Sequence, residues 1–310
     1  INFIGKRKIA YVFSTLFISF GMMALLFKGL ILGVDFKGGR SYVVTFNNSQ
    51  NPTEIESGLK ETFNNEGVEV KTFGADNILK ITTSYLISDE TDNADTQVKT
   101  NLISGIKSLT GLDYSKDDSK IDESNFTISS SSKVGATIAD DIKNSAFFSG
   151  VLALLAIFIY ILIRFRKWQF SVGAVIALFH DILFVISAFA FANLFGISYE
   201  IDQVFIAAML TIIGYSINDT VVVFDRIREN MGIKAGSDLI PVVNESINKT
   251  ISRTLITSMT TFIVVLVLFL FGGASLSGFS FALLIGIIVG TYSSVFIATP
   301  IVVDLYTENN

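Results

Sequence analysis

The chain has 310 residues, of which 50% are hydrophobic and 16% are charged, with a formal net charge of −5 and a mean hydropathy of +0.57. Soluble domains carry about a quarter charged residues, so this composition argues against a soluble enzyme. The absence of cysteine excludes disulfides, thiolate nucleophiles and cysteine-ligated metals, and a single histidine leaves little support for a histidine-ligated metal.

The charges divide the chain unevenly. Residues 39–142 carry nine Lys and Arg and seventeen Asp and Glu, a net charge of −8, whereas the remaining residues carry a net charge of +3. One part of the chain is therefore acidic and water-facing, and the other is apolar and slightly basic. The acidic part has the wrong sign for a nucleic-acid surface, so no nucleic-acid partner is expected.

Six segments are long and apolar enough to cross a bilayer as helices, which takes about 20 mostly apolar residues. Loops on the cytoplasmic side carry an excess of Lys and Arg, and here the basic clusters fall before the first span, after the second and after the fourth. The pattern predicts both termini in the cytoplasm and the acidic segment outside. The predicted spans are residues 9–27, 145–163, 170–193 and 203–224, followed by the uncharged run 254–303, which residues 272–278 divide into two.

These spans define three predicted parts: a cytoplasmic tip with the first span in residues 1–38, an external domain in residues 39–142, and a bundle of five further spans in residues 143–310. The external domain alternates between strand and helix patterns in the order β-α-β-β-α-β, which is typical of a ferredoxin-like α+β fold. That fold serves many functions, so a water-soluble spacer and a substrate-binding or partner-binding domain both remain open. Strands are predicted at residues 41–46, 68–73, 78–85 and 125–132, and helices at 52–65 and 96–109.

Asp219 is the clearest functional candidate, because an ionisable side chain at membrane depth costs from about 3 to 10 kcal/mol or more unless it is paired, hydrated or neutral. It lies in the fourth span, seven residues before Arg226, and therefore about 10 Å inside the cytoplasmic boundary. Asn218 is its neighbour, and Arg253 and Thr257 open the fifth span. An aspartate that faces an arginine near water can alternate between charge states, as proton coupling requires. A static ion pair that fixes the helix register is the alternative interpretation.

His180 and Asp181 lie near the middle of the third span, where a titratable pair can serve in a proton relay. Adjacent residues on a helix do not face the same way, so the two side chains need not act together. A structural role, with each side chain bonded to a neighbouring helix, is the interpretation that the sequence favours. They are secondary candidates.

The sixth span carries small residues at every fourth position, among them Gly286 and Gly290. Small residues at this spacing allow helix backbones to approach closely. This pattern predicts packing against another helix rather than chemistry.

Several segments of the chain form a set of motifs. They are residues 33–39 with Asp35, Phe36, Gly38 and Gly39, residues 214–219 and 225–230, residues 253–257, residues 290–294, and the His180-Asp181 pair. Together these motifs resemble the SecD/SecF family of protein-export membrane proteins, and within it the smaller, SecF-type subunits. The resemblance covers nearly the whole chain. One departure is the pair Gly135 and Ala136, where the family frequently has Gly-Pro, and it concerns only the local hinge geometry.

This resemblance implies half of a bundle of the proton-driven resistance-nodulation-division superfamily, in the bacterial inner membrane, with a periplasmic domain. The implied partners are SecD, SecYEG, SecA, YidC, YajC, the secreted preprotein and the lipid bilayer. The family's essential intramembrane aspartate and arginine correspond to Asp219 and Arg253. The implied protein is not an enzyme, has no ATP site and uses protons without a cofactor. The chain begins at Ile1, which fits both the second half of a SecD–SecF fusion and a separate subunit that lacks its first residues.

Two other classes remain open on the sequence alone. A small-molecule or lipid exporter of the same superfamily is expected to bring a large substrate cavity and twelve membrane helices, whereas this chain has six predicted spans. A non-conducting scaffold is the third class, in which Asp219 and Arg253 form only a structural pair.

Overall fold

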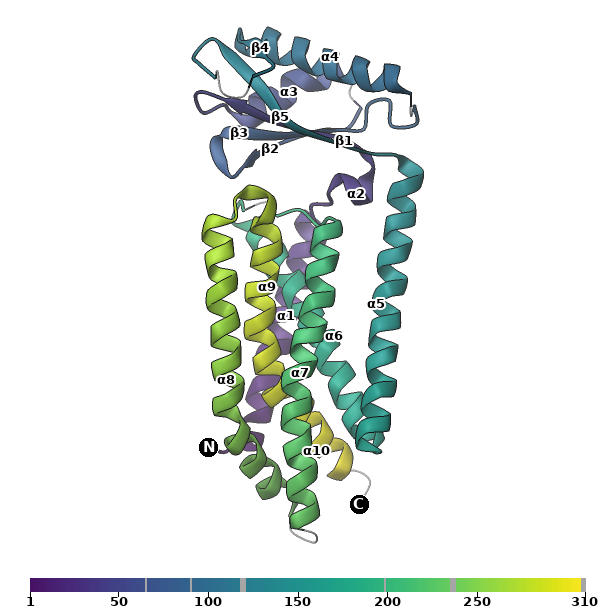
Figure 1. Ribbon diagram of the computed structural model, residues 1–310, viewed down its shortest axis with the longest axis vertical. Helices are drawn as coiled ribbons and strands as arrows, with labels where there is room; N and C mark the ends of the chain where they lie inside the picture. The colour runs from purple at the N-terminus through teal and green to yellow at the C-terminus, as the bar shows by residue number, and fades with distance from the viewer. Residues whose placement is uncertain (65, 90, 118–120, 198, 235–237, 308–310) are drawn as a thin grey trace.

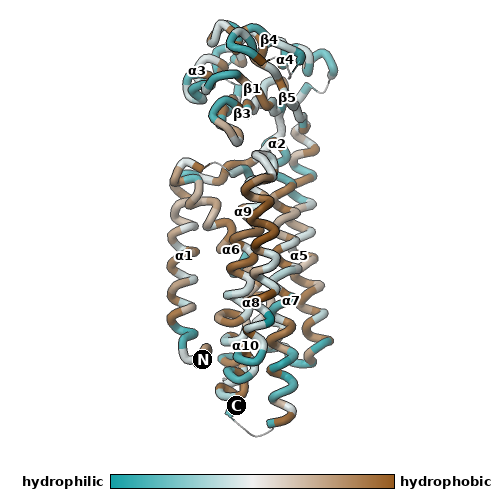
Figure 2. Tube along the Cα trace, turned by 60° about the vertical axis from the view of Figure 1, so that its left-hand side comes forward, coloured by the Kyte–Doolittle hydropathy of each residue, from teal (hydrophilic) through white to brown (hydrophobic). Residues whose placement is uncertain are grey.

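The computed structural model describes residues 1–64, 66–89, 91–117, 121–197, 199–234 and 238–307. It consists of a sheet domain at one end of a bundle of long helices (Figure 1). The end of the bundle next to the sheet domain is here called the proximal end, and the end where α1 begins and α10 ends is called the distal end. Apolar residues dominate the middle of the bundle, and polar residues dominate the sheet domain and the distal end (Figure 2).

In the described part of the chain, six helices are long and apolar enough to cross a membrane. This confirms the predicted number of spans, and the chain is a multi-pass membrane protein. The sixth span is interrupted by a short π-helical segment, η3 (Ser294–Ala298), which separates α9 from α10. The helices are α1 (Arg7–Lys28), which the 3-10 turn η1 (Ile4–Lys6) precedes, α5 (Ala136–Phe165), α6 (Trp168–Leu194), α7 (Gln203–Ile233), α8 (Leu239–Phe271), α9 (Ala274–Ser293) and α10 (Thr299–Thr307).

The region predicted as a loop at residues 225–253 is largely helical. It is formed by the distal turns of α7 and α8, and only residues 235–237 within it lie outside the described part. Ile227, Val243 and Ile247 are fully buried at helical spacing, so these charged segments are amphipathic. At 31 residues α7 is about 46 Å long, well beyond the hydrocarbon core of about 30 Å.

Two glycines set the contact between α7 and α9. A Cβ atom on Gly286 would lie 2.4 Å from the side chain of Ile212, and a Cβ atom on Gly290 would lie 3.0 Å from that of Ser216. Only a residue without a side chain allows the two helices to approach this closely. Both Ile212 and Ser216 are buried at this contact.

The sheet domain has the predicted β-α-β-β-α-β order with one additional strand. Its sheet has the order β2-β3-β1-β5-β4, in which all neighbours are antiparallel except β4 and β5. The additional strand is β4, which has only three residues and therefore too short a pattern to be recognised in the sequence. The elements are β1 (Gly39–Phe46), α3 (Pro52–Thr62), β2 (Val68–Phe73), β3 (Ala75–Thr83), α4 (Asp92–Thr110), β4 (Asp113–Ser115) and β5 (Asn125–Val134).

The two faces of this sheet have different roles. Tyr42, Val44 and Phe46 alternate along β1 toward the core, where α3 and α4 cover them. The opposite face carries Ser41 and Val43 and is directed toward the proximal end of the bundle (Figure 1). The chain leaves the sheet after Val134, and α5 begins at Ala136, so the predicted boundary at residue 142 falls within a continuous helix.

Candidate functional site

Asp219 is buried between three helices of the bundle. Its side chain is 3% exposed and projects from α7. Its Oδ2 atom accepts hydrogen bonds from Ser258 Oγ on α8 at 3.2 Å and from Thr291 Oγ1 on α9 at 3.4 Å. These two hydroxyls also contact each other at 2.6 Å. The carboxyl group is therefore surrounded by neutral donors rather than by a fixed countercharge.

Arg253 lies nearer the distal end of α8. Within the described residues it forms no ion pair with Asp219, although its positive charge acts on Asp219 through space. Arg253 is exposed and lines a groove of about 490 Å³ together with Asp225, Arg226 and Glu229. It precedes Ser258, a partner of Asp219, by five residues, which corresponds to about 7.5 Å along the helix. The backbone of Arg253 therefore lies closer to the distal end than Asp219 does.

The other two candidates near Asp219 face away from it. Asn218 is exposed and lines a groove between α7 and α5, where Tyr160 is also a lining residue. The hydroxyl group of Thr257 donates to backbone carbonyls of its own helix, those of Arg253 and Thr254. Neither side chain contacts the Asp219 carboxylate.

His180 and Asp181 form a second buried polar centre. His180 Nδ1 and Asp181 Oδ1 are 3.0 Å apart, although neighbouring residues on a helix point in different directions. Asp181 Oδ2 accepts from Ser216 Oγ on α7 at 2.6 Å and from Ser293 Oγ on α9 at 2.8 Å. Asp181 therefore joins three helices and is only 1% exposed.

The two acidic centres lie on different sides of α9. Thr291 bonds Asp219 and Ser293 bonds Asp181, and residues two apart on a helix point about 200° apart. Between them, the hydroxyls of Thr220 and Ser294 are 2.8 Å apart, and both reach the backbone carbonyl of Ser216. A movement of α9 therefore affects the hydrogen bonds of both carboxyl groups.

The serines and threonines that bind these carboxyl groups are the part of the site that the sequence did not specify. Ser and Thr in membrane helices often bond to their own backbone, as Ser280 does here, so a hydroxyl alone does not identify a partner. The one feature of the sequence that could have indicated these partners is the high density of hydroxyl groups in residues 291–294 of the sixth span.

The motif at residues 33–39 forms the joint between the bundle and the sheet domain. The short helix α2 (Val34–Lys37) places Phe36 in the proximal core, where it is 7% exposed, and Asp35 Oδ2 accepts from the backbone N of Gln203 at 2.9 Å. Asp35 thus binds the first residue of α7, the helix that carries Asp219. Asp202, one residue earlier, accepts from Phe205 N at 2.8 Å.

Gly38 and Gly39 make the turn into β1. Both have positive φ angles, +74° and +120°, which favour glycine. A Cβ atom on Gly39 would lie 2.5 Å from the backbone oxygen of Thr83. The glycine pair therefore allows the chain to pass directly from α2 into the centre of the sheet.

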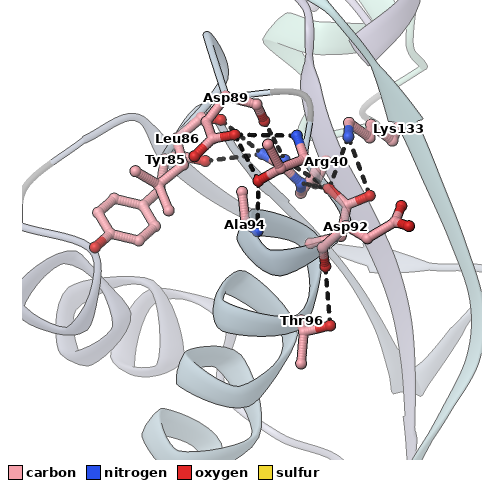
Figure 3. Close-up of polar contacts among 10 residues, drawn as sticks. Arg40, Tyr85, Leu86, Asp89, Asp92, Ala94, Thr96 and Lys133 are labelled. Carbon is pink, nitrogen blue, oxygen red and sulfur yellow. Dashed lines mark hydrogen bonds and ion pairs between the residues drawn. The ribbon is translucent and has the colours of Figure 1, made fainter.

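Arg40 locks the start of this strand into the sheet domain (Figure 3). Its guanidinium is 2.6 Å from Asp95 and donates to the backbone carbonyls of Tyr85, Leu86 and Asp89. Such a buried, fully bonded cation has a structural role.

The site provides groups that hold protons and no cluster for a metal. Among the described residues there is no group of three or more His, Cys, Asp or Glu side chains that could bind a metal ion. A buried carboxyl group with hydroxyl donors can exist in either the charged or the protonated form, because the hydroxyls can donate to the first and accept from the second. The arrangement is therefore suited to binding and releasing protons.

Comparison with known proteins gives two family matches. Residues 114–308 match the family described as Protein export membrane protein SecD/SecF, C-terminal, and residues 24–50 match the SecD/SecF GG motif. The second match contains the α2 joint and the two glycines.

Similar proteins of known name cover almost the full chain. Protein translocase subunit SecF of Rhodothermus marinus is 45% identical over 98% of this chain and 92% of its own length. The SecF subunit of Petrotoga mobilis is 37% identical over 98% of this chain and 96% of its own length.

Solved structures of SecDF share the fold. The crystal structure of SecDF from Thermus thermophilus matches 99% of this chain with a TM-score of 0.80 at 28% sequence identity, and a super-membrane-facing form of SecDF matches 100% of it with a TM-score of 0.66 at 26% identity. The chain spans 39% of each of those longer chains. The motifs, the six-span bundle with its sheet domain and these matches together establish that the chain belongs to the SecD/SecF family of protein-export membrane proteins.

Proposed function

We propose that the chain is an auxiliary subunit of the Sec protein translocase that uses proton movement at Asp219 to assist the export of preproteins. Its relatives at 45% and 37% identity are named protein translocase subunit SecF, which supports the role in export. The proton-driven step rests on the Asp219 site. It requires no cofactor other than the proton.

A second six-span bundle is part of this proposal. The chain corresponds to 39% of the SecDF chain, so a SecD part, separate or fused, supplies the remainder. Asn218 is exposed on α7 although lipid tails offer no hydrogen bonds. We infer that SecD covers this face and brings Arg253 and Asp219 into a common environment.

The wider assembly follows from the same role. SecYEG would supply the channel for the preprotein, SecA would drive its entry, and YidC and YajC would be further companions. The bundle would lie in the bacterial inner membrane with its distal end in the cytoplasm, because the distal loops carry the basic clusters. The sheet domain would then lie in the periplasm, where the preprotein emerges.

The connection from proton binding to the sheet domain runs along α7. Asp219 lies in the middle of this helix, and Gln203 at its first turn is bound by Asp35 of the α2 joint. A change in the charge of Asp219 alters its bonds to α8 and α9, and a resulting shift of α7 moves α2 directly. The joint then leads through Gly38 and Gly39 into β1.

The observation that carries the proposal is the environment of Asp219, which is 3% exposed and bonded only to two hydroxyls among the described residues. A carboxyl group fixed purely for structure at this depth is expected to face a countercharge.

The test replaces Asp219 by Asn in membrane vesicles that contain the assembled translocase. We expect Asp219→Asn to leave assembly and ATP-driven export intact but to remove the proton-gradient-dependent part of export and the proton flux. The matched control on the same helix is Asp225→Asn, which removes a half-buried carboxylate paired with Arg164 of α5 and Arg228 of α7. Full gradient-dependent export by Asp219→Asn would contradict the proposal, and substrate efflux without SecYEG would support the small-molecule exporter.

A further inference from the structure

We propose that His180 and Asp181 form a second proton-binding site, which water reaches from the distal end along the hydroxyl groups of a groove between α1, α6 and α10. The site lies on the other side of α9 from Asp219. Its role in export rests on the proposed function above, whereas proton binding by the pair does not depend on it.

The first observation is an unsatisfied ring nitrogen. His180 is 8% exposed, and its Nε2 atom is buried with no hydrogen-bond partner among the described residues. The other ring nitrogen, Nδ1, contacts Asp181. Leaving a buried polar atom without a partner costs about 1–3 kcal/mol, so a structural histidine at this position would be expected to have both nitrogens bonded.

The second observation is the groove that His180 lines. It has a volume of about 500 Å³, which is room for several water molecules at about 30 Å³ each. Tyr11, Ser14, Thr15 and Ser19 of α1 contribute hydroxyls to it, and Asp304 of α10 contributes a carboxylate. These groups give water hydrogen-bonding partners along a lining that is otherwise mainly apolar and that reaches the ring of His180.

The third observation is the polar cluster on its distal side. Asp304 accepts from Tyr11 at 3.1 Å and pairs with Arg7 at 3.0 Å, close to the distal end of α1. The cluster is partly exposed, so protons can exchange with the solvent there. It gives the groove a charged entrance on the distal side.

The proposed reaction takes up one proton at His180 and transfers one proton from His180 to Asp181. In the starting state Asp181 is a charged carboxylate. Its Oδ2 atom accepts hydrogen bonds from Ser216 and Ser293, and its Oδ1 atom accepts one from His180 Nδ1–H. A proton from groove water binds Nε2 and forms the imidazolium. The Nδ1 proton then moves to Asp181 Oδ1, which leaves a neutral carboxylic acid and a neutral imidazole that carries its proton on Nε2.

Other titratable groups around the pair come from each helix packed against it. Tyr292 of α9 has its ring centre 6.1 Å from that of His180, and its hydroxyl contacts Ser14 at 3.1 Å. Tyr11 and Asp304 line the same groove, and Arg7 pairs with Asp304. On α7, Asp219 follows the Asp181 partner Ser216 by three residues. A charge change at either acid is therefore felt at the other through α7 and α9.

The chain offers an unusually direct measurement, because His180 is its only histidine. The full chain is prepared with ¹⁵N-histidine and reconstituted in lipid vesicles, where solid-state NMR records one imidazole as the pH is varied between about 8 and 5. We expect a reversible change of the ring from the Nδ1–H form to a form that carries a proton on Nε2. Asp181→Asn, which cannot take up the Nδ1 proton, is expected to shift the pH at which this change occurs.

A histidine that stays in one form across this range, or a midpoint that Asp181→Asn leaves unchanged, would overturn the proposal. The export arm uses His180→Asn, which keeps an N–H donor near Asp181 but does not titrate, with Ser149→Ala, at an exposed position of α5 outside the groove, as the control. Loss of most gradient-dependent export and an altered pH profile are expected for His180→Asn alone. Titration in NMR with unchanged export would refute the coupling but leave the proposed function at Asp219 intact.

Discussion

The partners of each buried charge decide what that charge can do. The Arg40 guanidinium is held by Asp95 and by three backbone carbonyls, so every alternative position would lose several charge-assisted bonds. Among the described residues, the Asp219 carboxyl group has two hydroxyl donors, at 3.2 and 3.4 Å, and these are hydrogen bonds of ordinary or weak length. Arg40 is therefore a fixed element of the fold, whereas the weaker bonds of Asp219 are compatible with the proposed change of its charge.

The charged cluster around Arg40 predicts how the sheet domain responds to acid. The hydrogen bond from Lys133, together with the charge of Arg40, holds the pKa of Asp95 below its usual value. A depressed pKa stabilises the fold at pH above the unfolded value of about 4, and this stabilisation is lost as the pH falls through the folded pKa. We expect hydrogen-exchange protection of β1 and α4 in the full chain to be constant above about pH 5 and to fall below about pH 4.

The matched variant for this prediction is Asp95→Asn, which keeps a side chain of the same size. It is expected to lower protection at neutral pH and to make the decline in acid shallower, because one of the titrating groups is removed. A decline of equal steepness in Asp95→Asn and wild type would show that Asp95 does not contribute.

At the scale of elements, α7 connects the buried acid with the joint. Its first turn is bound by two carboxylates, since Asp35 accepts from Gln203 N and Asp202 accepts from Phe205 N. Burial, with further contributions from the charges of Asp35 and Glu200, raises the pKa of Asp202. The start of α7 is thus held both by its own N-cap and by a residue from the segment that enters the sheet domain.

Removal of the hydrogen bond between Gln203 N and Asp35 should loosen the proximal end of α7. Asp35→Ala leaves the backbone N of Gln203 without its acceptor, which costs about 0.5–2 kcal/mol for a helix N-terminus. We expect faster hydrogen exchange in the first turn of α7 and weaker gradient-dependent export, while exchange around Asp219 stays slow. Asp76→Ala, on an exposed part of β3, serves as the control. Unchanged exchange at Gln203 would show that Asp35 does not secure the helix.

The elements were largely predictable from the sequence, and the contacts between them were not. Long apolar runs specified six spans, because a helix in lipid satisfies its own backbone. The charges of residues 225–253 obscure an amphipathic pattern, so the sequence predicts a loop where the structure has the distal turns of α7 and α8. Asp219 and Asp181 stood out through their charge, but Ser258, Thr291 and Ser293 did not, since their role depends on which helices are neighbours. The 3.0 Å contact of His180 with Asp181 depends on side-chain rotamers, which helix periodicity does not give.

At the scale of the whole molecule, the sheet domain contacts the bundle through a polar interface as well as through the α2 joint. Lys80 of β3 and Glu200 of the α6–α7 connection form an ion pair at 2.5 Å, with side chains 20% and 15% exposed. They line a cleft of about 280 Å³ between the open face of the sheet and the proximal end of the bundle. The domain is thus held in one orientation by a contact that can separate without disturbing either core.

A charge reversal tests this orientation. Glu200→Lys is expected to repel Lys80 and lengthen the distance between spin labels at positions 129 and 277, and the double variant with Lys80→Glu is expected to restore it. The cysteine-free chain allows the labels to be introduced without removing native thiols. Lys60→Glu, which disrupts an exposed pair on α3, is the control. Equal distance distributions in all four proteins would show that the ion pair does not set the orientation.

The short strand β4 protects the sheet domain against aggregation. Without β4, the ten-residue strand β5 would present a long row of free backbone N–H and C=O groups, and such an edge is a template for the addition of another polypeptide strand. The three residues of β4 replace part of this row with a much shorter edge, and the opposite edge strand β2 carries Glu69 and Lys71, which hinder strand addition by their charge. A domain with such edges can work beside unfolded chains in transit without becoming a nucleus for cross-β assembly.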